Sequence, residues 1–175
     1  MTTSNPAIYI ENIFSLGPWQ LRVFHNNHGI EQAGFIMPAM PSVAPPYKAE
    51  CLQGERSAFT QAIEAYLNDY LCHRPPAVTL PLVDQGSSFR QRVWAALRAI
   101  PAGSQMTYGQ LARTLNSAAQ PIGGACRHNP IAFFTPCHRI VAATGLGGFM
   151  GLAEASDQLQ CKSWLLRHEK GFNHA

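Results

Sequence analysis

The chain has 175 residues, of which 46% are hydrophobic and 13% charged, and its net charge is +3. A chain of this length and composition can bury a core, which excludes an intrinsically disordered protein. No basic segment opens the sequence, and no apolar run approaches the roughly 20 residues that cross a bilayer. We therefore expect a cytoplasmic protein without a signal peptide or a membrane span.

The charged residues are unevenly distributed along the chain. Residues 1–83 carry four Lys and Arg against six Asp and Glu, a difference of −2, whereas residues 84–175 carry nine against four, a difference of +5. We predict two domains with this boundary: the first with a structural role, the second in contact with a polyanion. The five cysteines lack the compact, even spacing of a disulfide framework, which indicates reduced thiols.

The first domain is predicted to contain a sheet and one helix. Turn residues separate three apolar, β-favouring runs at 8–14, 19–24 and 30–36, a pattern that predicts a small antiparallel sheet. Four prolines between residues 37 and 47 predict a loop. Over residues 59–71 apolar side chains recur at helical spacing, which predicts an amphipathic helix covering one face of the sheet.

The second domain is predicted to be mainly helical. After a linker over residues 78–86, Ser87 or Ser88 is placed to cap a helix that runs to Ile100. The last helix of the chain is expected at about residues 156–168, where apolar side chains again recur.

Two short helices are predicted between these. Thr107 is placed to cap the first, which runs to Leu115, and Pro121 is expected at the first position of the second, which continues to His128. Two short, tightly joined helices in a basic region indicate a helix-turn-helix, which we expect to be winged-helix-like. The predicted fold class is therefore α+β: a small antiparallel sheet with a covering helix, followed by a mainly helical domain.

Cys137 is the candidate nucleophile. A free cysteine is mostly protonated at neutral pH, so a reactive one needs a base, a cation or a helix N-terminus nearby. His138, Arg139 and Asn129 supply candidates, although adjacency in sequence does not make Cys137 and His138 a dyad. The alternative for such a residue is a buried, inert cysteine.

A series of motifs gives this cysteine a context. The most specific is Pro136-Cys137-His138-Arg139, and six others precede or follow it in a fixed order. Those six span residues 89–94, 100–103, 107–112, 123–125, 129–130 and 164–169. Together these motifs resemble the O6-alkylguanine-DNA alkyltransferase family, over almost all of residues 80–170.

The resemblance implies a role for each residue of a relay. Cys137 would accept the alkyl group, His138 would take the thiol proton through a water, and Glu169 would orient His138. Asn129 would brace the turn, and Tyr108 would donate a proton or hydrogen bond to the departing guanine while helping to eject the nucleotide, because a target inside a duplex must be flipped out. The resulting thioether would make the protein react once, with no metal or other cofactor.

The resemblance also implies a partner, double-stranded DNA that contains alkylated bases. The helix with Gly123 and Gly124 would enter the minor groove with little sequence preference, while Arg90 and Arg127 could contact phosphates or remain solvated. Gln120 stands where the family usually has the arginine that fills the gap left by the flipped base, so we expect weaker flipping. We expect the protein to act as a monomer.

The substrate pocket implied by the resemblance includes Pro136, Phe149 and Met150. Phe149 replaces a tyrosine of the family, and the lost hydrogen bond to the lesion oxygen is worth about 1 kcal/mol, which predicts slower transfer rather than none. The substrates implied are O6-alkylguanine, mainly with a methyl group, and O4-alkylthymine as a second candidate. Met150 could reshape the pocket, so the range of alkyl groups stays open.

Two alternative functions remain open at this stage. The first is a lesion sensor that binds alkylated bases without repairing them; such relatives generally replace the acceptor cysteine, whereas Cys137 is present, but Gln120, Phe149 and Met150 depart from the repair pattern. The second is a Cys-His hydrolase built on Cys137, which would need an oxyanion hole and turnover. The sequence indicates neither an oxyanion hole nor turnover.

Some members of the family hold a structural zinc ion in the first domain. The candidate ligands here are His25, His28, Cys51, Cys72 and His73. Their spacing matches no compact zinc module, and the first two are expected in a surface hairpin turn. We therefore predict no metal.

Overall fold

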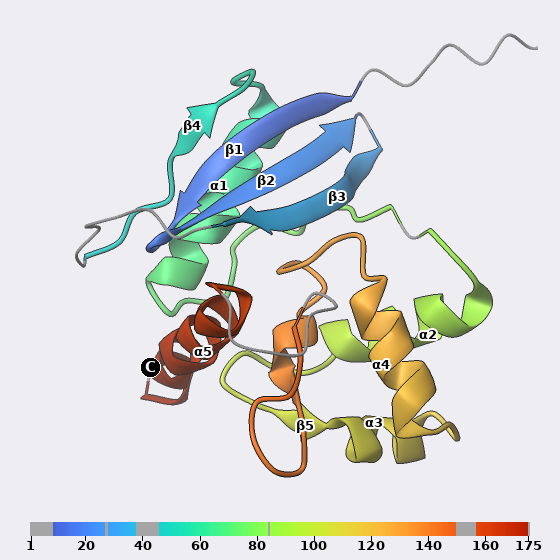
Figure 1. The fold of residues 1–175 in the computed structure, drawn as a ribbon. Coiled ribbons are helices and arrows are strands. Elements are labelled where there is room, and N and C mark those ends of the chain that lie inside the picture. The colour runs from blue at the N-terminus through green and yellow to red at the C-terminus, as the bar shows by residue number, and fades with distance from the viewer. Residues whose placement is uncertain (1–8, 27, 38–45, 84, 150–156, 175) are drawn as a thin grey trace, which may run out of the picture.

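The computed structural model describes residues 9–26, 28–37, 46–83, 85–149 and 157–174. It is an α+β fold, as predicted. Figure 1 shows the sheet and its helix in one part of the molecule and the helices of the second half in the other, with the last helix beside both.

The sheet has four strands in the order β3-β2-β1-β4, and all neighbours are antiparallel. The predicted meander is confirmed as β1 (Ile10–Leu16), β2 (Trp19–Asn26) and β3 (Gly29–Ile36). The short β4 (Cys51–Gln53) was not predicted, because three residues are too few to show a period. Residues 38–45 of the predicted loop lie outside the described residues.

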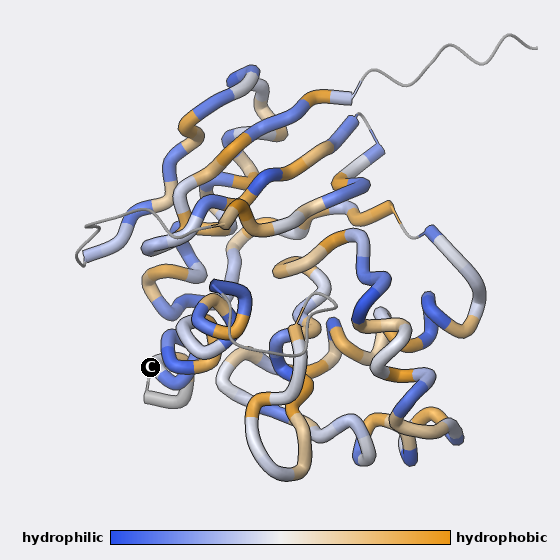
Figure 2. Tube along the Cα trace, in the orientation of Figure 1, coloured by the Kyte–Doolittle hydropathy of each residue, from blue (hydrophilic) through white to orange (hydrophobic). Residues whose placement is uncertain are grey.

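Alternating side chains give the sheet one buried face. Along the strands hydrophobic and hydrophilic residues alternate, as Figure 2 shows. The predicted covering helix is α1 (Ala58–Leu71), capped by Ser57, whose side chain accepts from the Thr60 N–H. Its fully buried Ile63 and Leu67 belong to the same cluster as the inward residues of the sheet.

The predicted position of one histidine was wrong. His25 was expected in a surface turn, but β2 continues two residues beyond the predicted end at Phe24, so strand alternation directs His25 inward. Its Nε2 lies 2.7 Å from Oδ1 of Asn12, and both side chains are buried.

The helices of the second half follow the predicted order. α2 (Ser88–Arg98) is capped by Ser87, and α3 (Tyr108–Thr114) is capped by Thr107. The Thr107 cap is reciprocal, because Gln110 Oε1 accepts from the Thr107 N–H at 2.7 Å.

The next helix begins earlier than predicted. α4 (Ala119–Arg127) places Pro121 at its third position rather than its first. A proline is tolerated there because the first turn of a helix has no internal partner for its N–H groups. α3 and α4 pack against each other and form the two helices of the predicted helix-turn-helix; its winged-helix character stays a prediction.

Short elements complete the second half. β5 (Met106–Thr107) and β6 (Ile140–Val141) pair in parallel, and the 3-10 helix η1 (Cys137–Arg139) precedes β6. The last helix, α5 (Asp157–Glu169), is followed by η2 (Lys170–His174) and ends one residue beyond the predicted His168. Among the described residues, no helix is long and apolar enough to cross a membrane.

Backbone pairing joins the two halves along β3. The Ala33 N–H donates to the Pro130 carbonyl, and the Ala132 N–H donates to the Ala33 carbonyl, both at 2.9 Å. The predicted linker also pairs with this strand, since the Val83 N–H donates to the Ile30 carbonyl at 2.8 Å. The linker is therefore hydrogen-bonded to the sheet edge, while the domain boundary near residue 84 stays a prediction.

Candidate active site

The candidate nucleophile lies in a braced, buried turn. Cys137 opens η1 and is 5% exposed. Asn129 Nδ2 donates to the Thr135 carbonyl at 2.8 Å, and Asn129 Oδ1 accepts from the Ile131 N–H at 3.1 Å. One amide side chain therefore holds both ends of the segment that leads to Cys137.

His138 and Glu169 form the next contact. Nε2 of His138 lies 2.7 Å from Oε1 of Glu169, and each side chain is 1% exposed. Because a carboxylate only accepts, the proton belongs on Nε2. Nδ1 has no hydrogen-bond partner among the residues that the structure describes, so its lone pair can accept a proton.

Arg139 shares the charge of Glu169. Its Nη2 donates to Oε1 at 2.8 Å and its Nε donates to Oε2 at 2.9 Å. From the sequence, Arg139 is a candidate cation to stabilise the Cys137 thiolate. In the structure its guanidinium instead donates to the Glu169 carboxylate and to the carbonyl of Ile100. Burial raises the pKa of Glu169, but His138 and Arg139 outweigh it and lower the pKa to about 2.

The imidazole of His138 is held neutral. Burial lowers its pKa, although Glu169 opposes that shift. Arg139 reduces the effect of Glu169 on the His138 pKa, because its positive charge already offsets the negative charge of the carboxylate. At neutral pH the site therefore holds a neutral base beside an ionised, paired carboxylate.

The thiol itself is not pre-ionised. Burial raises the pKa of Cys137, and the Asn129 hydrogen bond and the charge of Lys162 offset only part of this effect. Proton removal by a base is thus needed for reaction at neutral pH. Cys126 is also buried, and burial raises its pKa to about 12, so this thiol too stays protonated at neutral pH.

No sequence pattern distinguishes Lys162, a lysine within α5. Its side chain is fully buried, and Nζ donates to the carbonyls of Ile140, Leu146 and Gly148 at 2.7, 2.6 and 3.0 Å. Burial lowers its pKa to about 8. Lysines are almost always solvated, so only the folded structure shows that this one fastens the segment after Cys137.

Tyr108 is the first residue of α3 in the helix-turn-helix, and its side chain reaches the segment that Lys162 holds. Its hydroxyl donates to the Gly148 carbonyl at 3.4 Å. A Cβ at Gly147 would approach the Tyr108 ring to 3.2 Å, and one at Gly123 would approach it to 3.9 Å. Burial raises the Tyr108 pKa to about 12, with Cys126 and Cys137 contributing, so its hydroxyl keeps its proton.

The residues predicted to contact DNA lie on the outer side of the helices. Gln120 and Arg127 are exposed on α4, and Arg90 is partly exposed on α2. A Cβ at Gly124 would meet no atom within 4 Å, so this part of α4 has an open surface.

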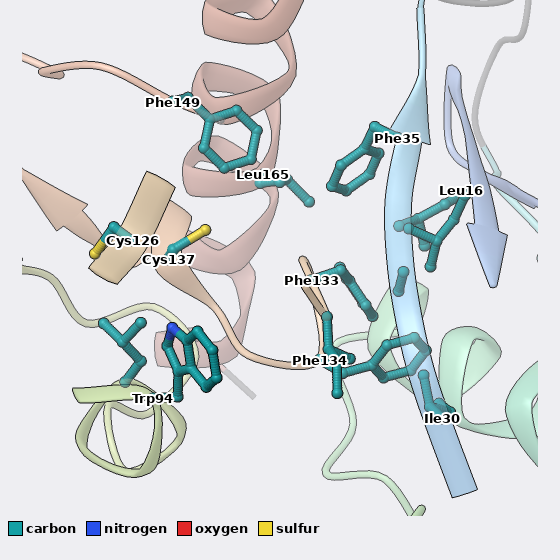
Figure 3. Packing of buried hydrophobic residues seen from close by; sticks show 14 of the residues in the cluster. Leu16, Ile30, Phe35, Trp94, Cys126, Phe133, Phe134, Cys137, Phe149 and Leu165 are labelled. Carbon is teal, nitrogen blue, oxygen red and sulfur yellow. The ribbon is translucent and has the colours of Figure 1, made fainter. Parts of the chain in front are cut away.

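The predicted pocket residues lie in different surroundings. Pro136 is buried directly before Cys137. Phe149 is also buried, with its ring centroid 6.4 Å from that of Phe35 on β3; Figure 3 shows it near Leu165, on the side of Leu165 away from Phe35. Met150 lies outside the described residues.

Two of the candidate zinc ligands, His25 and His73, are engaged with other groups. Over the described ranges, no group of three or more His, Cys, Asp and Glu side chains could hold a metal ion. His25 contacts Asn12, and Nε2 of His73 lies 2.9 Å from the His168 carbonyl. All five cysteines are free.

The fold and the site together define a class: an α+β protein with a helix-turn-helix and a buried thiol beside a histidine-carboxylate pair. Residues 88–171 match the family model "6-O-methylguanine DNA methyltransferase, DNA binding domain". The human methylated-DNA–protein-cysteine methyltransferase is 34% identical over 152 residues, which cover 81% of this chain and 70% of that protein. The chain therefore belongs to the methylated-DNA–protein-cysteine methyltransferase family.

Other relatives agree with this assignment. The enzyme of that name from Salmonella typhimurium is 46% identical over 94 residues, so this chain spans about half (52%) of that relative's length. The crystal structure of the Mycobacterium tuberculosis O6-methylguanine methyltransferase has a TM-score of 0.68 and 26% identity, covering 93% of both chains. A structure of the same organism's OGT in complex with DNA has a TM-score of 0.66 and 28% identity, covering 87% of this chain and 88% of that one.

Proposed function

We propose that this protein repairs DNA by transferring an alkyl group, mainly methyl, from O6-alkylguanine to Cys137 in a single turnover. The observation that carries the proposal is the 2.7 Å contact between His138 and Glu169 directly after a buried Cys137. That arrangement supplies a neutral base for a thiol that cannot ionise unaided. O4-alkylthymine is a second candidate substrate with the same chemistry.

The proposed reaction is an in-line displacement at a saturated carbon. Nδ1 of His138 takes the Cys137 proton through a water molecule, a new S–C bond forms, and the bond between the alkyl carbon and O6 breaks. The electron pair stays on the guanine, which the hydroxyl of Tyr108 stabilises by donating a hydrogen bond or its proton. The product is a thioether on Cys137. The proposed mechanism contains no step that cleaves its new S–C bond, so each protein molecule reacts once.

The proposed partner is double-stranded DNA with alkylated bases. The open surface of α4 at Gly124 supports a close approach to the duplex backbone, and the exposed Arg127 supports contact with phosphate. We propose that α4 enters the minor groove, that the damaged nucleotide is flipped toward Tyr108, and that the protein acts as a monomer. The free cysteines support a reducing, cytoplasmic location.

The test uses a duplex that contains one O6-methylguanine and peptide mapping by mass spectrometry. We expect the Cys137 peptide to gain one methyl group, Cys137→Ala to show no gain anywhere, and Cys126→Ala to react like the parent protein. Cys126 is the matched control because it is a second buried thiol with a raised pKa.

Two other results would replace the proposal. Tight binding to the damaged duplex without any mass gain after long incubation would falsify repair and identify a lesion sensor. Product released over many cycles, with no modified Cys137 remaining, would instead identify a hydrolase.

A further inference from the structure

A tyrosine of the first half of the chain reaches the carboxylate of the site. Tyr70 lies near the end of α1, and its hydroxyl donates to Oε1 of Glu169 at 3.2 Å, although the two residues are 99 positions apart. Tyr70 is 4% exposed and Glu169 is 1% exposed. The hydrogen bond is therefore screened little by solvent.

The Tyr70 ring is fixed by aromatic neighbours from the second half of the chain. Its centroid lies 4.8 Å from that of Phe133, 5.0 Å from that of His168 and 5.6 Å from that of Phe172. His168 directly precedes Glu169 in α5, and its Nε2 lies 3.1 Å from the Tyr70 carbonyl. The end of α1 is thus fastened to the end of α5 where the hydroxyl meets the carboxylate.

The hydroxyl of Tyr70 is a permanent donor. Burial first, and then the charge of Glu169, raise the pKa of Tyr70 well above its ordinary value. It cannot ionise at any pH where the protein works, so it always donates. Each donor to a carboxylate reduces the negative charge that the carboxylate offers to its other partners.

We propose that Tyr70 is a positioning residue through which the first half of the chain sets the basicity of His138. The inference rests on the proposed function. Tyr70 holds Oε1 in place for the His138 Nε2–H and draws off part of its charge, so that the imidazole releases a proton more readily. The first half of the chain would then take part in the reaction as well as in folding.

Other charged or titratable groups face the same pair, and the experiment keeps them constant. Arg139, Lys162 and Glu169 act on His138, while His138, Arg139, Tyr66, Tyr70 and His168 lie near Glu169. Tyr66 provides the matched control. It precedes Tyr70 by one turn of α1 and packs on Phe133 and Phe134, but no hydrogen bond joins it to Glu169 among the described contacts.

The test compares Tyr70→Phe with Tyr66→Phe in the full chain, by NMR titration of His138 and by the single-turnover transfer rate against pH. We expect Tyr70→Phe to raise the His138 pKa by roughly 0.5–1 unit and to move the acid limb of the transfer rate upward equally, because the carboxylate regains charge. Tyr66→Phe should leave both unchanged. In a Glu169→Gln background, Tyr70→Phe should have no further effect on His138.

An unchanged His138 pKa in folded Tyr70→Phe would overturn the inference, as would an equal shift in Tyr66→Phe. The titration also separates this inference from the proposed function. If the parent protein transfers no alkyl group, the proposed function fails, but the His138 titration still decides the role of Tyr70.

Discussion

At the scale of single residues, the site is governed by a histidine that burial keeps neutral. Because the His138 pKa lies below the usual value of about 6.5, the base is available throughout the neutral range. Protonation of His138 on acidification removes the base, while the unfolded chain takes up the same proton already near pH 6.5. Both transfer and the contribution of His138 to folding stability should therefore decline on the acid side.

The predicted pH profile has a single acid limb. With saturating damaged duplex, we expect the single-turnover rate to fall as pH drops from 7 to 5, following the lowered His138 pKa, while a separate change near pH 8 would report on Lys162, whose pKa is about 8. Rapid-quench measurement of methylated Cys137 between pH 5 and pH 8 checks this. A half-maximal rate at or above pH 7 would contradict a base with a lowered pKa.

Lys162 leads to a second prediction at the same scale. Lys162→Met keeps the apolar stem but removes the ammonium group that donates to the carbonyls of Ile140, Leu146 and Gly148, and with it the cation near Cys137. We expect the free energy of unfolding to fall by about 1–3 kcal/mol and transfer to slow by roughly tenfold.

Chemical denaturation and the single-turnover rate measure the two effects of Lys162→Met. Lys170→Met is the control, since Lys170 is exposed on η2 and should change neither quantity. Equal results for the two variants would show that the buried ammonium group contributes nothing to the segment after Cys137.

At the scale of elements, α4 presents the surface that we propose enters DNA. Gln120 is exposed in its first turn, where the family usually places an arginine. We expect Gln120→Arg to strengthen binding to a duplex with O6-methylguanine or to speed transfer, because a longer cationic side chain can fill the space of the flipped base. Fluorescence anisotropy and the single-turnover rate measure these two quantities.

The control for α4 adds the same charge one residue away. Ala119→Arg tests whether any cation on this exposed turn improves binding through phosphate contacts alone. If Gln120→Arg changes neither binding nor rate, or if Ala119→Arg matches it, position 120 has no special part in nucleotide flipping.

The elements themselves were largely predictable, because their signals are local. Ser87 and Thr107 cap their helices as expected, and the strand alternation of β1 to β3 is visible in the sequence. The start of α4 was misplaced because Ala118 makes no side-chain cap. Contacts across the chain had no such signal: the hydrogen bond from Tyr70 to Glu169 joins distant segments, and the burial of Lys162 contradicts the usual behaviour of lysine.

At the scale of the whole molecule, a single hydrophobic cluster spans both halves of the chain. Phe133 and Phe134 from the segment before Cys137 pack on Tyr66 and Tyr70 of α1, and Phe133 also contacts Phe35 of β3. Figure 3 shows these two phenylalanines beside the strand that carries Phe35, on the side toward Cys137. Phe133 and Phe134, which lead to Cys137, are thus part of the core that both halves share. Disrupting that core should lower the stability of both halves.

Phe133 offers the sharpest test of that shared core. Its backbone has φ +75°, an unfavourable value for a non-glycine residue, so its ring contacts must outweigh the strain. We expect Phe133→Ala to lower the free energy of unfolding by about 3–5 kcal/mol. Phe133→Gly loses the same ring and relieves the backbone, so it should be no less stable than Phe133→Ala, although glycine usually destabilises a folded chain.

Fluorine NMR of protein labelled with fluorotryptophan can follow this unfolding in each half. Trp19 in β2 reports on the sheet and Trp94 in α2 reports on the helical half, and both are buried. In the parent protein and in Phe133→Ala, we expect both resonances to lose their native positions at one shared denaturant concentration, lower in the variant, since the hydrophobic cluster that spans both halves loses only the Phe133 ring. Separate midpoints in the parent protein would show that the two halves unfold independently, and equal stability of Phe133→Ala and the parent would show that the ring does not hold them together.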